Sequence, residues 1–328
     1  MRAVLLTGHG GFDRLDIRDD VPVPECGEGD VLVRVGAAGV NNTDVNTRLG
    51  WYSGGGWTGS FEFPRIQGID ACGTIVAVGS GVDASRVGQR VLVEPCWRDP
   101  VQFLGSEVDG AFAEFCRVPS RYAHMVQSSL SDVELASFPC SYSTAENLLT
   151  RASVVAGQRV LVTGASGGVG SAAVQLAAAR GAVVAALAAV DKQEAVQALG
   201  ADVVATRDAD LVGVFGADSF DAVIDVVGGP GFPPLLDVLR PFGTYAVAGA
   251  IGGPTVDLDL RTLYLKDLRL FGCTVLDDGV FAALVRRIEH GDVAPVVAAT
   301  FPLERIVEAQ ELFLTKQHVG KIVLDLTP

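Results

Sequence analysis

Three glycines at positions 167, 168 and 170 separate an apolar segment, 159–163, from a stretch of helix-forming residues. Glycine lets the backbone approach phosphate groups, and a helix N-terminus presents free N–H groups and a positive dipole. A strand, a glycine turn and a helix in this order favour binding of a dinucleotide pyrophosphate. The alternative is a glycine-rich turn of another α/β protein, since Ala165 replaces the first glycine of the usual motif. The predicted phosphate loop is Ser166, Gly167, Gly168, Val169 and Gly170.

The end of the next predicted strand, 182–188, indicates which cofactor is bound. A site for NAD usually carries Asp or Glu there to bind the ribose 2′-hydroxyl. From the start of this strand no acid occurs until Asp191, whereas Lys192 follows directly and Arg207 ends the third strand. Two cations without a carboxylate suit a 2′-phosphate, so we expect NADP(H). The alternative is that both cations are ordinary solvated surface charges.

The elements that must position this loop alternate between strand and helix. After residue 130, apolar strands are predicted at 159–163, 182–188, 202–206, 222–227 and 244–249, with helices between several of them. This alternation is typical of a parallel sheet covered on both faces, an α/β doubly wound fold. Before residue 130, short strands punctuated by Gly and Pro predict a small barrel or sandwich.

Composition excludes several other classes of protein. The chain has 328 residues, a hydrophobic fraction of 49% and a net charge of −14, which indicates a globular protein without the basic face of a nucleic-acid binder. The longest apolar run is nine residues, too short to cross a bilayer. With no signal peptide evident, we expect a cytoplasmic protein whose six cysteines are reduced thiols.

Several motifs together resemble the medium-chain dehydrogenase/reductase superfamily. They lie at 39–44, 48–52, 68–73, 87–91, 110–115, 167–170, 198–201, 225–229 and 318–323. The resemblance implies a GroES-like β-barrel catalytic domain, formed by 1–126 and 276–328. It also implies a Rossmann dinucleotide-binding domain at 127–275, in which Thr144, Val227 and Gly249 contact the cofactor beside the phosphate loop.

The branch of the superfamily is indicated by the positions that hold catalytic zinc in its alcohol dehydrogenases. These positions are Asn41, Ile69 and Cys140 here, and Ile69 cannot bind a metal. We therefore predict no metal site, and interpret Cys140 as an inert thiol. The chain resembles the zinc-independent quinone oxidoreductases, including the zeta-crystallin-like reductases. That resemblance implies NADPH, with Lys192 on its 2′-phosphate and Arg207 in place of a frequent tyrosine.

The same resemblance suggests how the reaction proceeds. Without a Lewis acid, hydride transfer suits a quinone or an α,β-unsaturated carbonyl. Tyr52 is the first candidate to donate a hydrogen bond or proton, and bulk water is the alternative source. Asn41 would orient the nicotinamide ribose or the substrate. Asp44 completes the catalytic candidates, although it could instead hold backbone N–H groups or Arg48.

A small apolar substrate could stack on aromatic side chains in predicted loops. Trp51, Trp57 and Trp97 are the candidate pocket residues, and ordinary core packing is the alternative for each. The glycines at 54–56 suggest that this loop moves as a lid. An apolar edge strand at 268–274 would pair with its twin in a homodimer.

Two other functions stay open at this point. One is an alcohol or aldehyde dehydrogenase of the same superfamily that binds zinc unconventionally. The other is a non-catalytic NADPH-binding protein, against which Asn41, Asp44 and Tyr52 argue mildly. Neither a nucleic acid nor a membrane is expected as a partner.

Overall fold

Two compact units make up the protein, seen in a computed structural model that describes residues 1–54 and 61–327. The first unit comprises 1–140 and 295–328, and the second comprises 141–294. The domain boundaries expected from the sequence, at 126/127 and 275/276, stay a prediction. The helix α3, Pro139–Arg151, runs across the first of the observed boundaries.

The first unit is built mainly from antiparallel strands. Its largest sheet has the order β10-β6-β5-β3-β18-β17, with β9 also beside β3, and smaller sheets are β2-β1-β4 and β7-β8. The strands are β1 (Ala3–Leu6), β2 (Leu15–Arg18), β3 (Asp30–Val40), β4 (Arg65–Ile66), β5 (Cys72–Val78), β6 (Arg90–Val93), β7 (Cys96–Trp97), β8 (Gln102–Phe103), β9 (Phe115–Pro119), β10 (Ala123–Met125), β17 (Val297–Pro302) and β18 (Lys321–Asp325). Its helices are α1 (Asn42–Leu49), α2 (Asp132–Leu135) and α10 (Ile306–Thr315).

The C-terminal strand explains why the chain returns to the first unit. Strand β18 pairs antiparallel with β3, with Ile322 opposite Val40. Both strands are almost fully buried, because each contributes to one apolar core under the sheet. This register places Lys321, the first residue of β18, next to the end of β3 where α1 begins.

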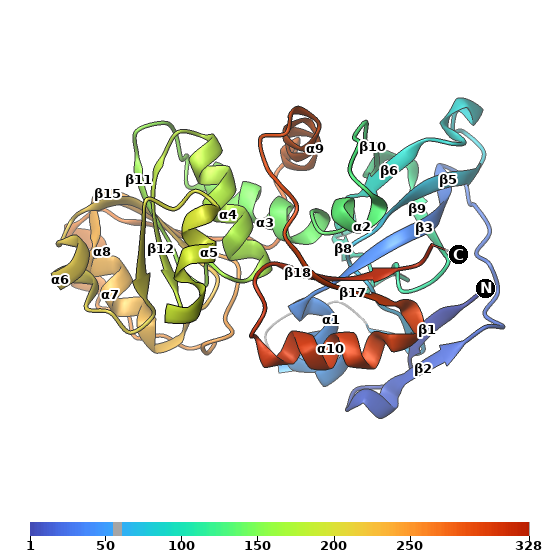
Figure 1. Ribbon diagram of the computed structural model, residues 1–328, viewed down its shortest axis with the longest axis horizontal. Helices are drawn as coiled ribbons and strands as arrows, with labels where there is room; N and C mark the ends of the chain where they lie inside the picture. The colour runs from blue at the N-terminus through green and yellow to red at the C-terminus, as the bar shows by residue number, and fades with distance from the viewer. Residues whose placement is uncertain (55–60, 328) are drawn as a thin grey trace. The chain divides into compact units, whose positions relative to one another are not determined.

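The second unit contains a parallel six-stranded sheet in the order β13-β12-β11-β14-β15-β16. The strands are β11 (Arg159–Val162), β12 (Val183–Ala188), β13 (Val203–Thr206), β14 (Phe220–Asp225), β15 (Leu239–Val247) and β16 (Arg269–Gly272). The helices are α4 (Gly168–Ala179), α5 (Gln193–Ala198), α6 (Leu211–Phe215), α7 (Phe232–Asp237), α8 (Leu260–Leu265) and α9 (Val280–His290). Figure 1 shows α4 and α5 on one face of this sheet and α6, α7 and α8 on the other.

The strand order identifies where a ligand would bind on this sheet. From β11 the chain first moves outward through β12 and β13, and then returns to β14 on the other side of β11. In doubly wound sheets, ligands bind beyond the carboxyl ends of the strands where this reversal occurs. Cofactor-binding groups are therefore expected at the ends of β11 and β14.

The α/β fold expected from the sequence, with a GroES-like unit and a Rossmann unit, is confirmed. Among the short strands of the first unit, β3 is long, from Asp30 to Val40, and a 3-10 turn at Val190–Lys192 precedes α5. Helix α9 was not anticipated. In the described part of the chain, no helix has both the length and the apolarity that crossing a membrane requires.

Candidate active site

The glycine loop joins β11 to α4 in a tight turn. Gly164 has a φ of +57°, a conformation that favours glycine, and Gly167 caps the N-terminus of α4. A Cβ on Gly170 would lie 2.1 Å from the carbonyl oxygen of Gly164, so no side chain fits there. The backbone of the loop therefore packs against the first turn of α4, whose N–H groups form the kind of cradle that binds a pyrophosphate.

Lys192 and Arg207 follow the neighbouring strands β12 and β13. The Lys192 side chain is buried, and burial is the main reason that its pKa falls below the ordinary lysine value. The negative charge of Asp191 opposes this shift, and the positive charge of Arg207 adds to it. The two cations are therefore close enough to interact electrostatically, and their contact with a cofactor stays a prediction.

Asp225, the last residue of β14, is fully buried and is a feature that sequence reasoning did not single out. Its Oδ1 accepts hydrogen bonds from the Thr163 hydroxyl at 2.5 Å and from the backbone N–H groups of Val227 and Gly228 at 2.8 and 3.1 Å. Its Oδ2 accepts one from the Tyr245 hydroxyl at 2.5 Å and shares the Gly228 N–H at 3.2 Å. These contacts tie together the ends of β11 and β14 and a residue of β15.

The other predicted cofactor contacts also lie on the second unit. Val227 lies two residues after Asp225. Gly249 lies two residues after the end of β15, and a Cβ on it would be 2.6 Å from the Val226 carbonyl oxygen. Thr144 is half-buried on α3. Their contacts with a cofactor stay a prediction.

In the first unit, a buried ion pair lies where β18 meets the end of β3. The Lys321 ammonium, 3% exposed, donates to Asp70 Oδ2 at 2.8 Å and to Asn41 Oδ1 at 2.5 Å. Asn41 Nδ2 donates to the same carboxylate oxygen at 2.8 Å, and Asp70 Oδ1 accepts from the Cys140 backbone N–H at 2.6 Å. Asn41 Nδ2 also donates to the Gly39 carbonyl oxygen. Both amide hydrogens of Asn41 are thus used within the unit, so this side chain is rigidly held.

Asp44 lies one turn into α1, beside this ion pair. Its carboxylate accepts a hydrogen bond from the backbone N–H of Asn41 at 2.8 Å, which caps the helix. Burial raises the pKa of Asp44 to about 7, helped by the negative charge of Asp70 and opposed by the Asn41 hydrogen bond and the Lys321 charge. This hydrogen bond is the alternative role considered for Asp44, in which its carboxylate holds a backbone N–H group.

Tyr52 follows α1 on a 3-10 turn, Trp51–Gly54. Asn46 Nδ2 donates a long hydrogen bond of 3.4 Å to the Tyr52 hydroxyl, and Trp51 lies edge-on to the Tyr52 ring at 5.2 Å. Burial is the main reason that the pKa of Tyr52 is raised above its ordinary value. The phenol therefore stays protonated at neutral pH and can donate a hydrogen bond.

The three tryptophans proposed for the pocket have different surroundings. Trp51 is 47% exposed, whereas Trp97 is buried in the apolar core and stacks on Tyr122 at 5.7 Å. The indole N–H of Trp97 donates to the Glu94 carbonyl oxygen. Trp57, with most of the 54–56 glycine run, lies outside the described residues. A substrate contact at any of the three stays a prediction.

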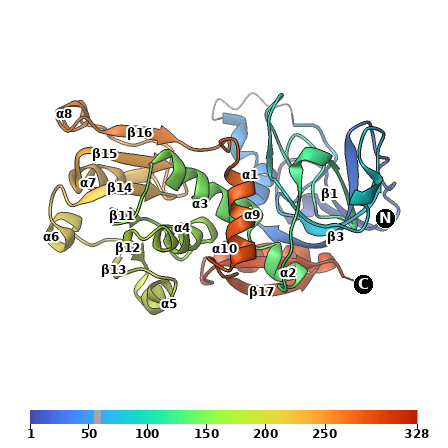
Figure 2. The same ribbon diagram turned by 90° about the horizontal axis from the view of Figure 1, so that it is seen from above.

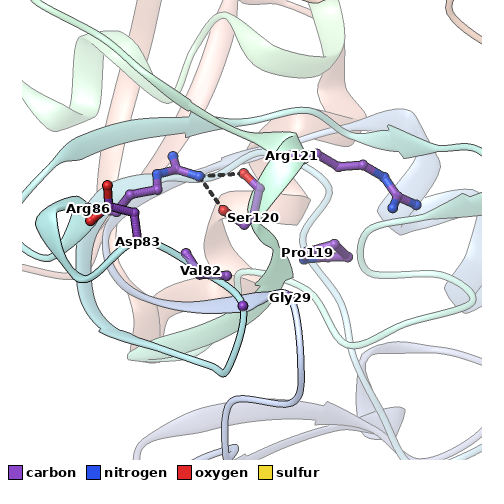
Figure 3. Close-up of a pocket in the computed structure, with 8 residues that line it drawn as sticks. Gly29, Val82, Asp83, Arg86, Pro119, Ser120 and Arg121 are labelled. Carbon is purple, nitrogen blue, oxygen red and sulfur yellow. Dashed lines mark hydrogen bonds between the residues drawn. The ribbon is translucent and has the colours of Figure 1, made fainter.

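A separate depression of about 410 Å³ lies on the first unit (Figure 3). Arg86 lines it, but its guanidinium is already bonded to the carbonyl and hydroxyl oxygens of Ser120 and to the Ala123 carbonyl oxygen. Arg121 stacks over the Tyr122 ring. Because these cations are engaged in holding the fold, the depression has no evident chemistry.

The chain matches two known domain families. Residues 27–128 match the alcohol dehydrogenase GroES-like domain, and 168–290 match the zinc-binding dehydrogenase family. The second description implies zinc, and the residues present do not fit it. Ile69 is apolar, and the Lys321 ammonium already bonds the oxygens of Asn41 and Asp70, where a second cation would be repelled. No cluster of three or more His, Cys, Asp or Glu side chains suited to a metal exists among residues 1–54 and 61–327.

Whole-chain comparisons agree with the domain matches. Human quinone oxidoreductase is 31% identical over 99% of this chain and 97% of its own, and the NADPH-dependent alkenal/one oxidoreductase of Arabidopsis thaliana chloroplasts is 30% identical over 99% and 79%. A solved structure from Sinorhizobium meliloti 1021, provisionally assigned as an alcohol dehydrogenase, is 46% identical with a TM-score of 0.92, covering 99% of this chain and 96% of that one. The glycine loop, the two units and these relatives together show that the chain is an oxidoreductase of the medium-chain dehydrogenase/reductase superfamily and belongs to its quinone oxidoreductase-like branch.

Proposed function

We propose that the protein is an NADPH-dependent reductase that transfers hydride to a quinone or an α,β-unsaturated carbonyl without zinc. The observation that carries this proposal is the buried ion pair of Lys321 and Asp70 at Asn41. Asn41 is one of the positions that correspond to zinc ligands in the zinc enzymes of the superfamily, and its amide oxygen here accepts a hydrogen bond from an ammonium. The names of the human and Arabidopsis relatives support the same class of acceptor.

Lys192 supports the choice of NADPH. Its ammonium is held in a buried position beside the charge of Arg207, which suits the two negative charges of a 2′-phosphate. The glycine loop would hold the pyrophosphate, with Thr144, Val227 and Gly249 toward the nicotinamide half. The bound nicotinamide supplies the hydride.

Tyr52 stabilises the product of hydride transfer in this proposal. Hydride delivered to an enone β-carbon or a quinone carbon leaves negative charge on the carbonyl oxygen. The protonated phenol of Tyr52 donates a hydrogen bond to that oxygen, and Asn46 holds the phenol oxygen in turn. Asn41 and Asp44 cap the N-terminal end of α1, the helix that precedes Tyr52, and Trp51 offers an exposed aromatic surface to a flat substrate.

We further propose that two copies associate through the edge strand β16. This strand and α8 lie at the outer edge of the sheet (Figure 2). Leu260, Tyr264 and Leu265 on α8 are each more than 60% exposed, and Leu270 on β16 is 37% exposed. An apolar, unpaired edge of this kind is typically covered by a second chain. Sedimentation of wild-type protein and of the Leu270→Lys variant tests this, with dimer expected only for the wild type.

The proposed cofactor is tested by titrating purified protein with NADPH and with NADH while following nicotinamide fluorescence. We expect tighter binding of NADPH and a loss of roughly ten- to hundredfold in NADPH affinity for Lys192→Ala, the size of one charged hydrogen bond. Affinity for NADH should not change. Arg18→Ala, at an exposed ion pair with Asp20 on the first unit, is a control for loss of one positive charge. Equal binding of the two cofactors by the wild type would contradict the assignment.

The proposed reaction is tested with a panel of quinones, enones and simple alcohols, together with metal analysis of the same sample. We expect turnover of quinones or enones, and less than stoichiometric zinc. An alcohol dehydrogenase is the second candidate, because the Sinorhizobium structure carries that assignment. Oxidation of alcohols with stoichiometric zinc would favour it. Tight NADPH binding without any turnover would instead indicate a non-catalytic protein.

A further inference from the structure

We propose that the buried negative charge of Asp225 makes the protein bind the oxidised nicotinamide cofactor more favourably relative to the reduced one. Asp225 would thereby make a bound NADPH a better hydride donor. It acts at a distance, through its charge and through the loop that it holds, and does not touch the substrate. This inference rests on the proposed function, because it requires a bound nicotinamide cofactor.

The hydrogen bonds indicate that Asp225 is ionised. Two of its partners are backbone N–H groups, which can only donate. The Thr163 hydroxyl accepts from the Val226 N–H at 3.1 Å, which leaves its own proton for Asp225 Oδ1. With the Tyr245 hydroxyl on Oδ2, the side chain is surrounded by donors, an arrangement that favours the carboxylate.

No cation neutralises this carboxylate. Among the residues described, Asp225 forms no ion pair, and every partner is an uncharged hydroxyl or amide. Asp70 in the other unit differs, because the Lys321 ammonium cancels its charge. Hydrogen bonds from neutral donors stabilise a charge but do not cancel its field, so the negative potential extends to the end of the sheet.

The strand order places this potential under the nicotinamide half of the site. Lys192 and Arg207 follow β12 and β13, so the adenosine half lies over that side of the sheet. The remaining half of a dinucleotide then extends across the reversal point toward β14 and β15. Asp225 ends β14, and the two N–H groups that it holds belong to Val227 and Gly228 in the loop immediately beyond.

The nicotinamide ring carries a positive charge only in its oxidised form. A fixed negative charge nearby therefore stabilises NADP⁺ and has little effect on NADPH, and such charges are one way a protein adjusts the chemistry of a cofactor. A purely structural role would be different: loosening the loop would weaken the binding of both forms together. The ratio of the two dissociation constants separates these possibilities.

Asp225→Asn is the variant that removes the charge and keeps the shape. Its amide oxygen can accept the three bonds made by Oδ1, and its NH₂ can donate to the Tyr245 oxygen. We expect the ratio of the NADP⁺ to the NADPH dissociation constant to rise roughly three- to tenfold, the change that Coulomb attraction over about 12–25 Å gives for an effective dielectric constant of about 20. Titration calorimetry with each form measures this ratio, and thermal unfolding confirms that the variant is folded.

Tyr245→Phe gives a prediction of opposite sign that does not depend on the first variant folding. It removes the hydroxyl dipole, whose positive end points at Asp225 Oδ2 and offsets a small part of the negative potential, so the ratio should fall, by roughly twofold. If either folded variant weakens both cofactor forms equally, or leaves the ratio unchanged, the proposal is overturned. If the wild type binds neither form, the proposed function fails first, and this inference fails with it.

Discussion

Two helices of the first unit begin with the same hydrogen-bonding motif in different surroundings. At α1, the Asp44 carboxylate accepts from the backbone N–H of Asn41 at 2.8 Å, and at α2 the Glu134 carboxylate accepts from that of Ser131 at 2.7 Å. Both are capping boxes. The pKa of Asp44 rises to about 7, mainly because of burial, whereas the pKa of Glu134 falls, mainly because of the hydrogen bond from Ser131.

The difference shows that the setting of a motif decides its electrostatic effect. A carboxylate that water can reach gains from the helix N–H group and loses little by desolvation. The same carboxylate in the core is desolvated, and one hydrogen bond does not offset that cost. The pKa of the carboxylate in the buried box therefore depends on neighbouring charges. The charge of Lys321 opposes the rise in the pKa of Asp44.

The largest expected effect is the loss of that cation. Lys321→Met leaves Asp70 buried without its partner, so we expect the free energy of unfolding of the first unit to fall by about 3–5 kcal/mol. Urea unfolding followed by tryptophan fluorescence measures this, since Trp51, Trp57 and Trp97 all belong to that unit.

Lys316→Met is the matched control for this experiment. Its ammonium also bonds an asparagine, Asn42, at 2.9 Å and lies over the Phe313 ring. Partial desolvation lowers the pKa of Lys316 to about 8, but the residue is exposed, so water can replace these contacts when they are lost. We expect a change below about 1 kcal/mol. Similar losses for the two variants would show that burial does not distinguish the two lysines.

The pH dependence of Asp44 should be the second-largest effect. Its pKa of about 7 in the folded protein lies above the ordinary value of 3.8, so between these values the native state binds a proton that the unfolded state has lost. The stabilisation from this group is complete below about pH 4 and is lost as pH rises through about 7. Stability of the wild type relative to Asp44→Asn should fall by about 1 kcal/mol per pH unit between pH 5 and 7. A constant difference over that range would rule out a buried, titrating Asp44.

Thr163 extends the comparison to the second unit, where a carboxylate is buried without a cation. Thr163→Val removes a donor to Asp225 Oδ1 and an acceptor for the Val226 N–H. Leaving these buried groups without partners should cost about 2 kcal/mol, measured by calorimetric unfolding. Thr163→Ser keeps the hydroxyl and should cost much less. If both variants lose the same stability, the methyl group and its packing are responsible instead of the hydrogen bonds.

The parts of this protein that local patterns determine could be predicted from the sequence. The capping box of Ser131 and Glu134 needs only a spacing of three residues, and the glycine loop needs only a strand before it and a helix after it. Glycine is required at position 170 because a Cβ there would clash with the Gly164 carbonyl oxygen of the same loop. In each case the interacting residues are close together in the chain.

The clusters around Asp70 and Asp225 could not be predicted in the same way, because their members are distant in sequence. Lys321 contacts residues at positions 41 and 70, and Asp225 contacts residues at 163 and 245. A signal was present: each is a charged residue at one end of a strand, directly next to three apolar, buried residues. Charges are seldom buried without partners, so such positions indicate a network even when its members are unknown.

The exposed capping box at α2 should show the smallest effect. Ser131→Ala removes the hydroxyl that accepts from the Glu134 N–H and donates to its carboxylate, so we expect a loss of about 1 kcal/mol in urea unfolding. Ser131→Asp supplies another good capping acceptor and should recover most of it. Because the pKa of Glu134 is lowered, its contribution is present above about pH 4.5 and is lost as pH falls, opposite in direction to Asp44. If Glu134→Gln and Asp44→Asn changed the pH dependence in the same direction, burial would not be what separates the two boxes.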